Sequence, residues 1–100
     1  MDSALLTVVA VFRARTGSSM ALGEALQALV EPTRKEDGCL NYDLHQANDD
    51  PDLFFFHETW RSVERHQAHL ETAHVRHLLA ISPALLQDPI REYKGRRIEP

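Results

Sequence analysis

Four histidines lie close together in the second half of the chain, at positions 66, 69, 74 and 77. Imidazole nitrogens bind metal ions, and their ordinary pKa near neutrality also suits them to proton transfer. The two H-x-x-H pairs would need a further metal ligand from a neighbouring element. On the expected helices, His66 shares an arc with apolar residues whereas His77 points away from the apolar stripe. We therefore expect that the four rings do not converge and that no metal is bound.

His69 and His74 are the candidates for acid–base chemistry. Both fall at the flanks of apolar stripes, where a ring can reach a cavity under the helices and keep one nitrogen for an anchoring hydrogen bond. The alternative is that they cap the helix junction by bonding a backbone carbonyl around Glu71 and Thr72. His66 either points into the same pocket or packs by its ring edge.

Aromatic residues alternate along the segment "LFFFHETW". Phe54, Phe56 and Trp60 share one side with Glu58, and His57 lies on the other side. The three rings could form a wall for a flat ligand, or Trp60 could simply fill the core. Glu58 is a charge on a largely apolar face and needs a partner such as a ring nitrogen or an Arg. The predicted substrate-binding residues are Trp60, Phe54, Phe56, Glu58 and His66.

The elements that hold these residues follow from hydrophobic periodicity. Strands are expected at 5–14, 40–46, 53–60 and 90–98, one helix from about Ser19 to Gly38, and a second helix in two pieces, 63–70 and 72–86, capped by Ser62 and Thr72. The order β-α-β-β-α-β predicts an α+β, ferredoxin-like fold with a four-stranded antiparallel sheet. At 100 residues the chain is one domain, 1–100.

The first and third predicted strands are apolar on both faces. Helices on one face of the sheet leave the other face uncovered, and the chain holds no further segment to cover it. We therefore expect a homodimer in which a second copy stacks sheet to sheet.

Composition excludes several partners. With a net charge of −4 and scattered basic residues, the chain has no Lys and Arg stripe for nucleic acid. The longest apolar run, 5–12, is too short to span a bilayer and lacks the features of a secretory signal, so we expect a cytoplasmic protein without a membrane partner.

The segments "PTRKEDGCLNYDLH", "FFFHETW" and "AHLETAH" closely resemble the antibiotic biosynthesis monooxygenase, or quinol-monooxygenase-like, proteins over nearly the whole chain. The resemblance implies a dimeric α/β barrel with a pocket between sheet and helices. It also implies a cofactor-independent monooxygenase that oxidises a quinol- or anthrone-like aromatic with dioxygen. His69 and His74 match the family's recurrent histidines, whereas His66 departs from its more usual apolar residue. No G-x-G-x-x-G motif is present, which agrees with the absence of a nucleotide cofactor.

Three alternatives stay open beside this activity. The haem-degrading branch of the family has a tryptophan where this chain has His69 and an iron-binding histidine where it has Leu79, so haem is disfavoured. A non-catalytic dimeric module that binds small molecules is compatible with the same fold. An isomerase using these histidines on a phosphorylated sugar is weakened because few basic residues lie near the expected pocket.

Overall fold

The computed structural model describes residues 5–100, so the first four positions of the predicted domain lie outside the described residues. The elements, in chain order, are β1 (Leu6–Arg13), α1 (Ser19–Gln27), α2 (Val30–Arg34), β2 (Cys39–Ala47), β3 (Asp50–Trp60), α3 (Val63–Leu70), α4 (Ala73–Ile81), the short 3-10 helix η2 (Ser82–Ala84) and β4 (Arg91–Gly95).

The four strands form one antiparallel sheet in the order β2-β3-β1-β4. The two strands predicted to be central, β1 and β3, occupy the middle, and the ferredoxin-like α+β fold class is confirmed. Val9 of β1 pairs with His57 on one side and Tyr93 on the other, which fixes the register across the sheet. Within one chain the sheet is open and does not close into a barrel.

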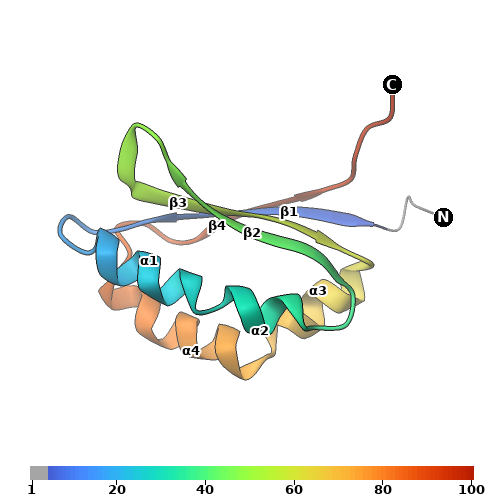
Figure 1. The fold of residues 1–100 in the computed structure, drawn as a ribbon, viewed down its shortest axis with the longest axis horizontal. Helices are drawn as coiled ribbons and strands as arrows, with labels where there is room; N and C mark the ends of the chain where they lie inside the picture. Colours follow the sequence, from blue (N-terminus) through green and yellow to red (C-terminus); the bar gives the residue numbers. More distant parts are fainter. Residues whose placement is uncertain (1–4) are drawn as a thin grey trace.

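All the helices lie against one face of the sheet, as Figure 1 shows. Side chains of β1 alternate between buried and half-buried, because every second residue faces the helices. The same alternation in β3 buries Phe54, Phe56, Glu58 and Trp60. The hydrophobic core therefore lies between the sheet and the helical layer.

The helix predicted from Ser19 to Gly38 is divided into α1 and α2. Pro32 has no N–H to donate to the carbonyl of Ala28, so the α-helical ladder cannot continue through this turn. Leu29 instead donates its N–H to the carbonyl of Leu26 at 3.1 Å, a tighter turn that separates the two helices.

Side-chain caps fix the two helices that hold the histidine cluster. The hydroxyl of Ser62 accepts the N–H of Arg65 at 3.2 Å, and the hydroxyl of Thr72 accepts the N–H of Val75 at 3.3 Å. Both caps confirm the helix starts predicted from the sequence. The α4 helix ends at Ile81 and tightens into η2, which contains Pro83.

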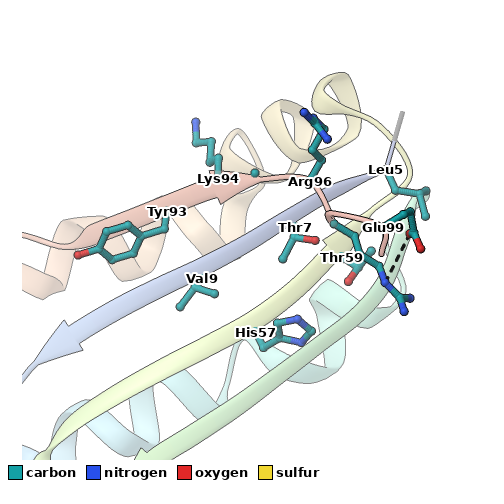
Figure 2. Close-up of a pocket in the computed structure, with 11 residues that line it drawn as sticks. Leu5, Thr7, Val9, His57, Thr59, Tyr93, Lys94, Arg96 and Glu99 are labelled. Atoms are coloured by element: carbon teal, nitrogen blue, oxygen red, sulfur yellow. Dashed lines mark ion pairs between the residues drawn. The ribbon is translucent and has the colours of Figure 1, made fainter. Parts of the chain in front are cut away.

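The opposite face of the sheet is free of helices in residues 5–100. Figure 2 shows Thr7, Val9, His57 and Tyr93 side by side on this face. They line a hollow of about 910 Å³ together with the segment after β4. Within the same range, no helix is both long and apolar enough to cross a membrane.

Candidate functional site

A single carboxylate joins the two candidate catalytic histidines. Oε2 of Glu36 lies 2.9 Å from Nδ1 of His69 and 2.6 Å from Nε2 of His74. The side chain of His69 is 5% exposed and that of His74 is 24% exposed, so the cluster runs from the interior to the surface. This geometry gives a hydrogen-bonded acid–base group with one end open to solvent.

The corner between α3 and α4 positions the two rings. His69 lies in the last turn of α3 and His74 in the first turn of α4. The Thr72 hydroxyl donates to the His69 carbonyl at 2.8 Å while it caps α4. One threonine therefore holds both helix ends in a fixed orientation.

The loop between α2 and β2 positions Glu36. Gly38 has φ of +88°, a conformation that L side chains rarely adopt, and a Cβ there would lie 2.5 Å from Cγ of Arg65. Arg65 also pairs with Asp37 at 2.9 Å, and the N–H of Arg61 bonds the Gly38 carbonyl at 2.8 Å. The loop is thus held against α3 and the end of β3.

Sequence reasoning missed Glu36 and misjudged the two histidines. The expectation that the rings do not converge is wrong for His69 and His74, which meet at this carboxylate. The alternative in which a ring bonds a backbone carbonyl around Glu71 and Thr72 is also wrong, because both rings bond the Glu36 carboxylate instead. At the helix junction it is the Thr72 hydroxyl that bonds a backbone carbonyl, that of His69. His77 is exposed, as predicted.

The protonation of the cluster follows from its geometry. An ionised carboxylate only accepts hydrogen bonds, so the nitrogens that face Glu36 are the ones that bear hydrogen. This leaves Nδ1 of His74 and Nε2 of His69 with free lone pairs. Burial lowers the pKa of His69, although the hydrogen bond to Glu36 opposes this shift.

Trp60 and Glu58 form the floor beneath His69. The Trp60 ring centroid lies 4.7 Å from that of His69, and its Nε1 donates to Oε1 of Glu58 at 2.9 Å. The predicted need of Glu58 for a partner is met by this indole nitrogen. Burial raises the pKa of Glu58 to about 7, although the bond from Trp60 opposes the shift.

His66 lies deeper under α3 and faces the last strand. Its side chain is 1% exposed, and within residues 5–100 its Nε2 has no hydrogen-bond partner. Oε2 of Glu92 lies 3.6 Å from this nitrogen. His66 lowers the pKa of Glu92. His66 also contacts Trp60, with ring centroids 5.8 Å apart.

The predicted aromatic wall is only partly adjacent to the histidines. Phe56 is fully buried and stacks on Tyr42 at a centroid distance of 4.2 Å. Phe54 lies under α1, where a Cβ on Gly23 would be 3.2 Å from its Cζ. Tyr42 is the ring that sequence reasoning missed, with its centroid 5.4 Å from that of His69. The signal was present, because Tyr42 lies directly opposite Glu58 in the β2–β3 ladder.

Neither His69 nor His74 lines any of three surface hollows found among residues 5–100. One is on the helix-free face, and two are beside α1 and α2 at the β2 edge. The rings of Trp60 and Phe56 are covered by neighbouring side chains. The part of the cluster open to solvent is its edge at His74 and Glu36, whose side chains are 24% and 15% exposed.

Comparisons with known proteins show the family to which the chain belongs. The family model described as antibiotic biosynthesis monooxygenase matches residues 5–80. Rv0793 of Mycobacterium tuberculosis, provisionally named as a monooxygenase, is 35% identical over 85 residues, which cover 85% of this chain and 83% of that protein. YcnE of Bacillus subtilis, named in the same provisional way, is 35% identical over 69 residues, 69% of this chain and 72% of that protein.

Solved structures show the same fold. The crystal structure of PA3566 from Pseudomonas aeruginosa has a TM-score of 0.93 and 37% identity, and the match covers 99% of each chain. The structure of Rv0793 has a TM-score of 0.89 and 29% identity, covering 96% of this chain and 97% of that one. The chain belongs to the antibiotic biosynthesis monooxygenase family.

Proposed function

We propose that this protein is a monooxygenase that oxidises a quinol- or anthrone-like aromatic with dioxygen and without a cofactor. The single observation that supports it most is the Glu36 carboxylate bound to both imidazoles beside Trp60. A carboxylate hydrogen-bonded to an imidazole supplies a base, and the carboxylate stabilises the imidazolium that forms when the imidazole takes up a proton.

The reaction needs little more than this base. Removal of a proton from an anthrone gives an electron-rich anion that can pass one electron to dioxygen. The two radicals couple to form a C–O bond, and cleavage of the O–O bond releases water, so that a CH₂ group and O₂ become C=O and H₂O. A low-polarity environment favours this sequence because it keeps water from the reactive anion. The buried Trp60 ring, which lies next to His69, contributes to the low polarity beneath the cluster.

His74 is the better placed of the two candidate bases. Its Nε2 is held by Glu36, its Nδ1 is free, and its side chain is several times more exposed than that of His69. We propose His74 as the base, with His69 beside it as a second proton carrier that contacts Trp60. The other proposed substrate-binding residues lie in the layer between the sheet and the helices: Glu58, Phe54, Phe56 and His66.

Members of this family are often dimeric, and we propose a homodimer here. Val9, Val11 and Phe55 are only half-buried on the helix-free face, and Tyr93 is exposed there. A second copy stacked on this face would cover these side chains. Sedimentation at micromolar concentration should give about twice 11.4 kDa, and a clean monomer would contradict the proposal. We also propose a cytoplasmic location.

The activity is tested by oxygen uptake with a panel of hydroquinones and an anthrone, with no cofactor added. His74→Ala should lower turnover by roughly 10²- to 10⁴-fold, the usual contribution of a general base. His69→Ala is measured in parallel. His77→Ala removes an exposed ring from the same helix and serves as the matched control, with turnover unchanged.

Two outcomes would change the assignment. If the wild-type protein only matches the autoxidation rate in buffer for every compound, the oxygenase proposal fails and a non-catalytic module that binds small molecules replaces it. If turnover is present and both histidine variants retain it, the base is another group, and Glu58→Gln is the next variant to measure.

A further inference from the structure

We propose that Glu36, His69 and His74 form a binding site for one divalent transition-metal ion of the zinc class. Nδ1 of His69, Nε2 of His74 and a carboxylate oxygen of Glu36 all lie within 4.8 Å of one another. Two imidazoles and one carboxylate are a ligand set that zinc, cobalt and nickel favour.

The donor spacing needs only a small expansion to hold an ion. Tetrahedral zinc with bonds of about 2.1 Å separates its ligand atoms by about 3.4 Å. The carboxylate oxygen now lies 2.9 Å and 2.6 Å from the two nitrogens. The two ring nitrogens lie within 4.8 Å of each other. Outward movement of the Glu36 oxygen by less than about 1 Å, together with rotation of the two rings to adjust the separation of their nitrogens, would give this geometry.

The three ligands come from separate elements that are already fixed. His69 and His74 are held at the α3–α4 corner by Thr72, and Glu36 sits on the loop docked by Arg65. An ion would therefore meet a largely ordered site rather than having to assemble one. The exposed edge at His74 leaves room for water as the remaining ligand, as in zinc sites with an open position.

Ion binding uses the ring nitrogens that face Glu36. A neutral imidazole can move its hydrogen to the opposite nitrogen, which frees the lone pair that the metal requires. For His74 the opposite nitrogen is Nδ1, the atom proposed above as the base. With its hydrogen on Nδ1, His74 could not act as the base, so a bound ion would block turnover. This consequence rests on the proposed function, whereas the binding of the ion does not.

The test measures binding directly, with or without a known substrate. Untagged Cys39→Ser protein, which lacks the single thiol as a competing ligand, is titrated with Co²⁺ and followed by its visible absorption, and with Zn²⁺ by calorimetry. We expect one ion per chain. Glu36→Gln and His74→Ala should each weaken affinity by at least about 100-fold, because loss even of an outer partner commonly costs 10- to 100-fold.

His77→Ala is the matched control and should bind as the parent protein does. Because the side chain of His74 is partly exposed, His74→Ala is expected to fold, and circular dichroism checks this. The site would be overturned if the parent protein showed no saturable binding, or if both ligand variants bound the ion as tightly as the parent does. Binding without any oxygenase activity would leave the site established and defeat the proposed function instead.

Discussion

The two faces of the sheet differ in the burial of the side chains that the same strands place on them. In β3, Phe56 and Glu58 point toward the helices and are buried, whereas Phe55 and His57, their neighbours in sequence, point to the helix-free face. Buried ionisable groups have shifted pKa values on the covered face. This difference fits the proposals that chemistry belongs to the covered face and association to the open one.

The largest effect expected from this difference is on stability. Phe56→Ala should lower the free energy of unfolding by about 3–5 kcal/mol, because it leaves a cavity beside Tyr42 in the core. Phe55→Ala, one residue along the same strand, should cost much less at low protein concentration, where the proposed dimer is dissociated. Chemical denaturation of both variants measures the contrast.

Protein concentration provides a second comparison between the Phe55→Ala and Phe56→Ala variants. If a second copy covers Phe55, the Phe55→Ala variant should dissociate at higher concentration than the wild type. On dilution, its unfolding midpoint should therefore stop depending on concentration sooner than that of the wild type. Equal losses in the two variants at every concentration would contradict the division between the faces.

A smaller effect concerns the pH dependence of stability. With a folded pKa of about 7 against an ordinary 4.5, Glu58 binds its proton more tightly in the folded state than in the unfolded one. Its contribution is therefore fully present below pH 4.5 and is lost as the pH rises toward 7, in total by about 3 kcal/mol. Groups near Glu58 that influence this titration are His66, Glu92, Glu36, Tyr42 and Cys39.

Glu58→Gln should remove this loss, and unfolding measured at pH 5 and at pH 8 tests it. The quantity compared is the change in unfolding free energy between the two pH values in the wild type and in the variant. His57→Gln, on the open face, should leave that change close to the wild-type value. An unaltered pH dependence in Glu58→Gln would contradict a pKa of Glu58 that is raised on folding.

The smallest expected effect compares two glycines with the same backbone conformation. Gly17 and Gly38 both have φ near +90°, but a Cβ would meet nothing within 4 Å at Gly17 and would collide with Arg65 at Gly38. Gly17→Ala should cost about 1 kcal/mol from backbone strain alone. Gly38→Ala should cost about 2 kcal/mol or more, and thermal unfolding should rank the two variants in this order.

The sequence was sufficient to predict the sheet and the helix starts. Strands alternate with a period of two and the caps Ser62 and Thr72 are local signals, so short-range pattern specifies them. It also separated the two faces of β3, because Glu58 and His57 are adjacent in sequence and must point in opposite directions.

Contacts between distant segments could not be predicted in the same way. Glu36 lies 33 positions before His69, and only the turn at Gly38 and its packing on Arg65 bring the two together. Strict alternation along β2 would place Leu40 on the same face as the buried Tyr42, but a register shift lies between Cys39 and Asn41 and Leu40 is 44% exposed.

The hydrogen-bonded cluster of Glu36, His69 and His74 is the central claim, and nitrogen-15 NMR of the imidazole rings tests it most directly. At neutral pH we expect His69 protonated at Nδ1 and His74 at Nε2, each with a downfield proton that exchanges slowly. Glu36→Gln should shift both signals and leave those of His77 unchanged. A His69 ring protonated only at Nε2, or signals that do not respond to Glu36→Gln, would contradict the account.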